Sequence, residues 1–238
     1  SSEAQWQRIG GPNGGIVTSI GVSSANIFTN LYPGETFLST NNGINWTSIN
    51  NGIEGYNIHA WAFSGNNVFA GASGGIFLST NNGTSWNSVN NGLTNHFINA
   101  FAVSGSNIFT GTSGGGIFLS TNNGTSWTAI NNGLINLNVT SLIFLGTKLF
   151  AGTYNSGVFV STNNGASWTS ANNGLTTQVI TSITISGTNL FVGTFNEGGV
   201  FLSTNSGISW TSVNNGLTSR SIESLASIGT RIFAGTHN

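Results

Sequence analysis

The sequence lacks cysteine, methionine and aspartate altogether, and it has little charge of either sign. Of 238 residues only 4% are charged, with four basic residues and five glutamates for a net charge of −1. Without cysteine the chain can form no disulfide bonds, so disulfides cannot indicate the cellular compartment of the protein. So few basic residues exclude an electrostatic surface for nucleic acid or an anionic membrane. A nearly neutral surface also tends to associate, which favours self-assembly.

Long apolar runs are absent as well. Gly, Ser, Thr or Asn interrupts the sequence every few positions, so no segment approaches the roughly 20 apolar residues of a membrane-spanning helix. We therefore expect no membrane insertion. Hydrophobic residues still make up 37% of the chain, including 16 Phe and 7 Trp. This content excludes a disordered polar chain and is enough for a large core.

One motif recurs along almost the whole chain. The string F-L-S-T-N-N-G-x-x-W, or a near copy, occurs five times, and its serines are 40, 41, 41 and 42 residues apart. A second segment, similar to V-T-S-I-x-x-S-x-x-x-I-F, occurs six times. Internal repeats of this length decide the architecture before any other feature. The second segment starts at Val17, Ile58, Ile98, Val139, Ile180 and Ile222.

Each repeat predicts four short strands, which we call a to d in chain order. In the repeat that begins at Ile98 they are predicted over 98–103, 107–112, 116–121 and 127–130, with Gly and Asn clustered between them. Asn-Gly is a strong signal for a hairpin, because both residues tolerate positive φ. A period near 41 residues with four strands is typical of a β-propeller blade. A β-solenoid is the alternative, but its rungs are usually shorter.

The blade count predicts a single domain over 1–238, an all-β six-bladed propeller of four-stranded antiparallel blades. The repeats run approximately over 17–57, 58–97, 98–138, 139–179 and 180–221, and a sixth blade is split between 222–238 and 1–16. The segment Trp6-Gln7-Arg8-Ile9 matches strand d, so both termini would close the sixth blade and remove an open sheet edge. No segment supplies its strand c. We therefore expect this blade to lack one strand or to be completed from outside.

The motif resembles the BNR or Asp-box repeat, S-x-D-x-G-x-[ST]-W, and is written here as Ser79-Thr80-Asn81-Asn82-Gly83-Thr84-Ser85-Trp86. That family includes sialidases, other glycosidases, sortilin-type receptors and secreted bacterial repeat proteins, and the resemblance implies a secreted or cell-surface protein of bacterial type after signal removal. Asn replaces the family Asp in every copy, and its side-chain carbonyl can still accept backbone N–H bonds. The resemblance implies that the boxes are structural. Their residues are Asn41, Gly43, Trp46, Asn81, Gly83, Trp86, Asn122, Gly124, Trp127, Asn163, Gly165, Trp168, Asn205, Gly207 and Trp210.

Catalytic groups are scarce. A sialidase-like site needs three converging arginines, but the three in this chain do not occupy equivalent places in their blades. A Ser-His-Asp triad is excluded without aspartate. Glu35 and Glu197 in b–c loops and Glu54 in a d–a loop could pair, but we expect solvated loop acids. The three histidines, His59, His96 and His237, are far apart in the sequence and lack metal-ligand spacing. We therefore expect no enzyme, cofactor or metal site.

The b–c and d–a loops vary between repeats and are expected to open on one face. These loops contain all three tyrosines. Such a face could bind a sugar or a protein through aromatic and polar contacts, although drift in unconstrained loops explains the same variation. The candidate ligand-binding residues are Tyr32, Glu35, Tyr56, His96, Tyr154 and Glu197.

The sequence thus predicts a non-catalytic structural scaffold that assembles with other copies of itself or with surface proteins. Near-zero charge and the unfilled sixth blade support this interpretation, because a donated strand would complete that blade. A glycan-binding, lectin-like module that uses the variable loop face is the first alternative, and a glycosidase is the second.

Overall fold

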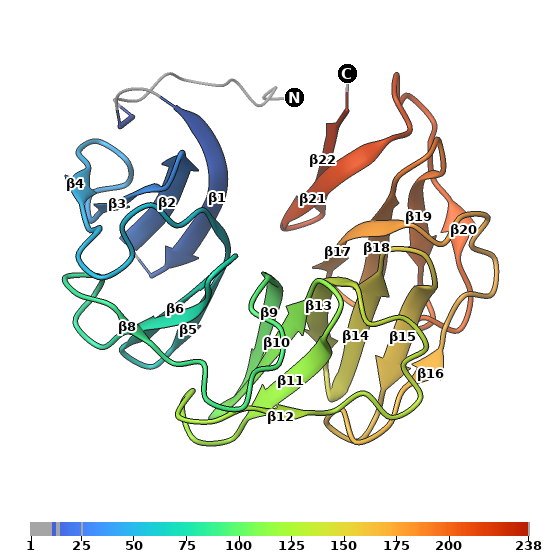
Figure 1. Cartoon of the computed structure of the whole chain (residues 1–238). Helices are drawn as coiled ribbons and strands as arrows, with labels where there is room; N and C mark the ends of the chain where they lie inside the picture. Colours follow the sequence, from blue (N-terminus) through green and yellow to red (C-terminus); the bar gives the residue numbers. More distant parts are fainter. Residues whose placement is uncertain (1–10, 13–14, 25, 238) are drawn as a thin grey trace.

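The computed structural model describes residues 11–12, 15–24 and 26–237. They form five four-stranded antiparallel sheets and one two-stranded sheet, arranged as blades around a common centre (Figure 1). This confirms the predicted six-bladed propeller with an incomplete sixth blade. Within the described part of the chain, no helix is long and apolar enough to cross a membrane.

Strands a and b of each blade lie nearest the centre, with strand a innermost (Figure 1). The six a strands are β1 (Ile16–Ser23), β5 (Ile58–Ser64), β9 (Ile98–Ser104), β13 (Val139–Leu145), β17 (Ile180–Ser186) and β21 (Ile222–Ile228). The six b strands are β2 (Asn26–Tyr32), β6 (Asn67–Ala72), β10 (Asn107–Thr112), β14 (Lys148–Thr153), β18 (Asn189–Thr194) and β22 (Arg231–Thr236).

Strands c and d complete the first five blades toward the outside. The c strands are β3 (Glu35–Ser39), β7 (Gly75–Ser79), β11 (Gly116–Ser120), β15 (Gly157–Ser161) and β19 (Gly199–Ser203). The d strands have two residues each: β4 (Thr47–Ser48), β8 (Asn87–Ser88), β12 (Thr128–Ala129), β16 (Thr169–Ser170) and β20 (Thr211–Ser212). In the sixth blade only β21 and β22 pair among the described residues, and the predicted strand d over 6–9 lies outside them.

The core lies between neighbouring blades. At four of the boundaries the first residue of an a strand packs on a glycine in strand b of the preceding blade, and at the boundary between the first and second blades Asn30 stands in place of that glycine. A Cβ on Gly152 would lie 2.6 Å from Cγ2 of Ile180, and one on Gly111 would lie 2.6 Å from Cγ1 of Val139. Glycine therefore marks a close approach of two sheets at these positions. Each hydrophobic cluster accordingly combines residues from consecutive blades.

The Asn residues of the boxes act as the sequence predicts. In the second blade, Oδ1 of Asn81 accepts the backbone N–H of Ser85 at 3.0 Å and the hydroxyl of Ser79 at 2.8 Å. Oγ of Ser79 accepts the N–H of Gly83 at 2.8 Å, and φ at Gly83 is +85°. The side-chain carbonyl thus replaces the Asp carboxylate of the resembled motif without loss of the turn. Asn41, Asn122, Asn163 and Asn205 repeat the backbone bond.

Four of the five motif tryptophans bond to the blade that precedes their own. Trp86 does lie near its turn glycine, but its Nε1 donates to the carbonyl of Ile49 in the preceding blade at 2.9 Å. Four of these indoles, those of Trp86, Trp127, Trp168 and Trp210, are also at most 4% exposed, whereas Trp46 is only partly buried. Each of these four tryptophans therefore joins two blades. The same bond to the preceding blade recurs at Trp127, Trp168 and Trp210.

Candidate functional site

The b–c and d–a loops lie side by side at one end of the blades. Backbone hydrogen bonds join them, as from Tyr154 N to Asn138 O at 3.0 Å and from Gly157 N to Gln178 O at 2.9 Å. The b–c loop of the fifth blade likewise donates from Gly199 N to Arg220 O at 2.8 Å. This arrangement gives the common loop face that the sequence predicts.

Tyr56 is the best anchored of the six candidate residues. Its ring lies 4.8 Å from that of Phe77, and a Cβ on Gly74 would collide with it. Its carbonyl accepts Nδ2 of the buried Asn30 at 3.3 Å. Tyr56 is therefore partly a packing residue that joins two blades, with one edge open to solvent.

The other five candidates are exposed, and apart from Tyr32 and Glu35, which flank the same turn, they come from separate loops. Glu35 begins β3 rather than lying in the preceding loop, and Glu197 accepts the hydroxyl of Ser221 at 3.4 Å. The ring contacts seen within the described ranges join no two tyrosines. Ligand binding at this face stays a prediction. The exposed residues are Tyr32, Glu35, His96, Tyr154 and Glu197.

The acids and histidines of the described chain do not converge. No group of three metal-ligating side chains is found there. Oε2 of Glu54 accepts the N–H of Gly52 in its own turn at 3.0 Å. Nδ1 of His237 lies 3.0 Å from Oε1 of Glu223, and both side chains are largely exposed.

A ring of polar residues along the inner strands was missed by sequence reasoning. The second residue of an a strand bonds the carbonyl of the first residue in the next a strand. Thr140 Oγ1 donates to Ile180 O at 2.7 Å, and Thr181 Oγ1 donates to Ile222 O at 2.7 Å. The signal in the sequence was a polar residue at the same position of each repeat. Thr18 and Asn99 make the equivalent bonds.

His59 occupies this position in the second blade but behaves differently. Its ring stacks on Phe97 with centroids 4.9 Å apart and planes at 18°. Its Nε2 is buried and has no hydrogen-bond partner among the described residues. Burial lowers the pKa of His59, because the charged form would lose its hydration.

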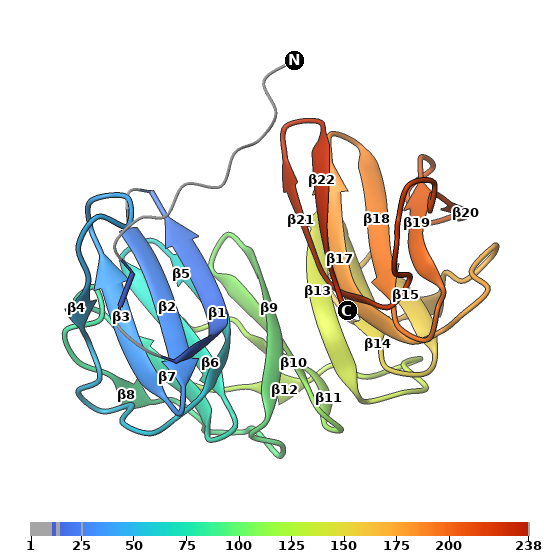
Figure 2. The same cartoon turned by 90° about the horizontal axis from the view of Figure 1, so that it is seen from above.

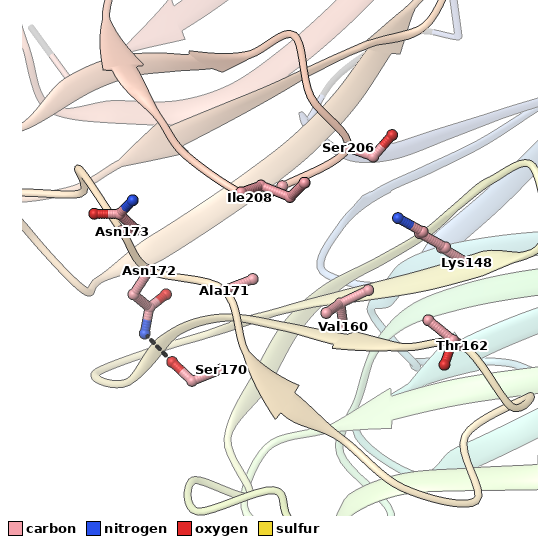
Figure 3. A pocket seen from close by; sticks show the side chains of 10 residues that line it. Lys148, Val160, Thr162, Ser170, Ala171, Asn172, Asn173, Ser206 and Ile208 are labelled. Atoms are coloured by element: carbon pink, nitrogen blue, oxygen red, sulfur yellow. Dashed lines mark hydrogen bonds between the residues drawn. The ribbon is translucent and has the colours of Figure 1, made fainter.

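A cavity of about 250 Å³ lies at the outer side of the boundary between the fourth and fifth blades (Figure 3). It exists because Ala171 stands where the other repeats have Ile49, Val89, Ile130 or Val213. Oδ1 of Asn172, on its wall, already accepts Val158 N at 2.7 Å, and Nδ2 bonds Ser170 Oγ at 3.0 Å. This cavity is a packing gap rather than a set of convergent functional groups.

Among the described residues, apolar side chains are left uncovered at the boundary between the sixth and first blades, which we call the open boundary. Strands β1 and β21 stand apart there, whereas every other pair of consecutive a strands is in contact (Figures 1 and 2). Val17 is 53% exposed, but its counterpart Val139 is fully buried. Ile20 is 64% exposed, against 8% for its counterpart Leu142. The open boundary therefore presents apolar residues that the other boundaries bury.

Comparison with known proteins identifies the architecture. No family model matches the sequence, and no curated protein matches it. The chain is similar in structure to YCF48 bound to D1 peptide, with a TM-score of 0.76, 15% identity, and 98% of this chain and 80% of that one covered. Membership of the BNR family therefore stays a prediction.

Two other similar structures are longer chains. An ancestral GH74 enzyme aligns with a TM-score of 0.74 and 21% identity over 99% of this chain and 36% of that chain. The extracellular domain of a protein described as a one component system from B. thetaiotaomicron aligns with a TM-score of 0.76 and 16% identity over 92% and 31%. This chain thus spans about a third of the length of each. These β-propeller neighbours establish the fold.

Proposed function

We propose that this protein is a non-catalytic, extracellular β-propeller scaffold that assembles with further copies of itself by accepting a β-strand into its sixth blade. The carrying observation is β22, which pairs with β21 on one side but has no strand c beside it among the described residues. In the other five blades the b strand pairs on both sides. Alternate N–H and C=O groups of β22 before Thr236 therefore point toward an edge that no described strand covers.

The sequence of β22 does not protect this edge. Sheet edges are usually blunted by proline, by charged residues or by a bulge. Strand β22 reads R-I-F-A-G-T and has a charge only at its first residue, Arg231. An unprotected edge of this kind is a template for strand addition, in which main-chain bonds supply the affinity.

The apolar residues of the open boundary add a second source of association. Ile16, Val17, Ile20 and Val22 are all exposed on β1, and Ile228 is exposed on β21. Burial of such side chains contributes about 1.5–3 kcal/mol each. Electrostatic repulsion between two copies of the chain is weak, since the net charge is −1.

The neighbours are compatible with this proposal. One of them is described as bound to a peptide and another as an extracellular domain. The scattered acids of the described residues support a non-catalytic role, because glycoside hydrolysis needs two carboxyl groups roughly 5–10 Å apart.

The test is the mass of the purified chain, measured by light scattering over a wide range of concentrations. We expect the mass to rise with concentration, and the V17N/I20N variant to reduce that rise. Substitution I44N is the matched control, because Ile44 is as exposed as Ile20 but lies in a box turn. A strictly monomeric protein at the highest concentration would overturn the proposal.

Strand donation itself is tested with a peptide of residues 115–124, which contains strand β11. The peptide should bind the chain and suppress its self-association, whereas a scrambled peptide of the same composition should not. If neither peptide binds but the V17N/I20N effect persists, association occurs through the apolar face rather than through the edge of β22.

A glycan-binding module is the second candidate. It is favoured by Tyr32 and Tyr154, which are exposed aromatic residues on the same loop face, and flat aromatic rings stack on sugars. A glycan array in which the wild type binds and Y32A or Y154A does not would support it. A blank array would argue against it.

A further inference from the structure

The nine Asn-Gly pairs of the described residues fall into two structural sets. Four lie in the boxes, and we call them box pairs. Five lie in the N-N-G-L turns, or N-N-G-I in the first blade, that follow the d strands, and we call them junction pairs. Asparagine before glycine is chemically labile, because glycine has no side chain to shield its nitrogen. Box pairs begin at Asn42, Asn82, Asn123 and Asn164, and junction pairs at Asn51, Asn91, Asn132, Asn173 and Asn215.

In a box pair the glycine nitrogen is buried and already bonded. Gly83 N–H donates to Oγ of Ser79 at 2.8 Å. The φ angles of +54° at Asn82 and +85° at Gly83 are those of a type I′ turn. All four box glycines are buried, and the bond to a box serine has the same length at Gly43, Gly124 and Gly165. A reaction at this nitrogen must first break a buried hydrogen bond.

In a junction pair the glycine is exposed instead. Gly92 has a φ of +89° and Asn91 does not have a positive φ, as in a type II turn, which is closed by Leu93 N and Asn90 O at 3.0 Å. Among the described residues, Gly92 N–H donates no hydrogen bond and the exposed amide of Asn91 makes none. Both reacting groups are therefore free. The same holds for the pairs that begin at Asn132, Asn173 and Asn215.

We propose that the junction asparagines are sites of spontaneous modification to aspartate and isoaspartate, and that the box asparagines are protected. The glycine nitrogen attacks Cγ of the asparagine and forms a C–N bond. The side-chain nitrogen leaves as ammonia, and takes up the glycine N–H proton through water. A second water molecule opens the five-membered succinimide at either carbonyl, which gives aspartate or isoaspartate. The net reaction consumes one water and releases one ammonia, and no atom is oxidised or reduced.

The modification would alter a contact between blades. Asn91 O accepts the backbone N–H of Trp127 at 2.9 Å, and a Cβ on Gly92 would lie 2.2 Å from the carbonyl oxygen of the same tryptophan. In isoaspartate the main chain runs through Cγ and is one atom longer, so the original carbonyl becomes a free carboxylate and the contact is displaced. Four conversions would also change the net charge from −1 to −5. Bonds equivalent to that of Asn91 are made by Asn51, Asn132 and Asn173.

Asn51 provides a comparison within the junction set. The N–H of Gly52 donates to Oε2 of Glu54 at 3.0 Å. This bond holds the attacking nitrogen, and the negative charge of Glu54 opposes loss of its proton. We therefore expect Asn51 to react more slowly than Asn91. The other repeats have Thr94, Ile135, Thr176 and Thr218 at the position of Glu54.

The experiment incubates the full chain at pH 8 and 37 °C in ¹⁸O-labelled water, and then maps the labelled sites by mass spectrometry after peptic digestion in acid. In the folded chain Asn91 and Asn132 should gain label at least about ten times as fast as Asn82 and Asn123. In urea the two sets should react at similar rates, because both have the sequence N-N-G. Equal rates in the folded chain, or junction sites that stay unlabelled there while they react in urea, would overturn the proposal.

Two variants test the stated causes of protection. S79A removes the acceptor of Gly83 N–H and should speed the reaction at Asn82, while Asn123 in the same molecule stays slow. E54T should bring the rate at Asn51 up to that at Asn91. Unchanged rates at Asn82 and Asn51 in these variants would show that the two hydrogen bonds do not protect the glycine nitrogens, and would overturn the structural basis of the proposal.

The effect on the blade boundaries is measured separately. The Tm of the wild type should fall during the incubation, and the variant N91Q/N132Q/N173Q should keep its initial Tm, because glutamine forms the corresponding ring much more slowly. The matched variant N82Q/N123Q/N164Q should lose Tm as the wild type does. A Tm that does not change while the junction sites gain label would overturn the loosening of the boundaries. The site map is read on each molecule separately, so it holds whether or not the chain assembles.

Discussion

Two boundaries have similar sequences but differ in packing: the one between the fourth and fifth blades, and the open boundary between the sixth and first. At the first, Ile180 covers Gly152, and Trp210 bonds the carbonyl of Ala171 at 2.7 Å. At the second, Val17 is exposed and the nearest atom to a Cβ on Gly235 is Oγ of Ser224 in its own blade. Each repeat therefore provides apolar side chains for contact between blades, and these side chains are buried only where a neighbouring blade covers them.

The largest expected effect is the loss of a boundary tryptophan. Trp210→Ala should lower the free energy of unfolding by about 3–5 kcal/mol, because it removes a buried ring and a hydrogen bond between blades. Trp46→Ala should cost at most about half as much, since Trp46 is only partly buried. Urea unfolding of the two variants measures the difference. Equal losses would show that the first blade is covered in solution as fully as the fifth.

The boundary glycines give the next largest contrast. Gly152→Ala should destabilise by about 1–3 kcal/mol, because the new methyl group would lie 2.6 Å from Ile180. Gly235→Ala should cost less than about 1 kcal/mol, since among the described residues the closest obstacle to the new methyl group is the Ser224 hydroxyl, which can rotate away. Denaturant midpoints with unchanged slopes provide the measurement. A large loss at Gly235 would mean that Val17 contacts it in solution.

Much of this fold could be predicted from the sequence, because the turn and core positions repeat with a fixed period. The predicted strands 98–103, 107–112 and 116–121 match β9, β10 and β11 to within one residue at each end. The predicted strand 127–130 shrinks to Thr128–Ala129, since Trp127 turns toward the preceding blade. The local residue pattern determines the turns within a blade, whereas the contacts between blades depend on how neighbouring sheets pack against each other.

The candidate site was less accessible to prediction. Variable loops could be located, and their common face follows from antiparallel pairing. The packing of Tyr56 on Phe77 could not be foreseen, because that contact joins a loop of one repeat to strand β7 of the next. The ring of bonds through Thr140 and Thr181 likewise needs the position of the next blade. The sequence signal for this ring of bonds was a polar residue at one position of each repeat, but a strand face exposed to solvent has the same pattern.

A smaller effect is expected at the gap beside Ala171. Replacement by isoleucine, which is present at the equivalent positions 49 and 130, should fill part of the 250 Å³ cavity and stabilise the protein by about 0.5–1.5 kcal/mol. Ala166→Ile is the matched control, because Ala166 is exposed in a box turn where other repeats have Ile44 or Ile208. Calorimetry of both variants is the measurement. Equal stabilisation would show that the gain does not come from the cavity.

The smallest expected effect concerns the ring of inner-strand bonds, where His59 differs from Thr140. Burial lowers the pKa of His59 below its ordinary value of 6.5, so below about pH 6.5 the unfolded chain takes up the proton first. Its contribution is therefore complete at higher pH and is lost as the pH falls through the lowered pKa. His59→Thr should remove this slope and allow the bond to the next strand that Thr140 makes to Ile180 O. Unfolding free energies from pH 7.5 to 4.5 test it, with the exposed His96→Thr as a control that keeps the slope. An unchanged slope in His59→Thr would show that the ring position of this histidine does not govern its protonation.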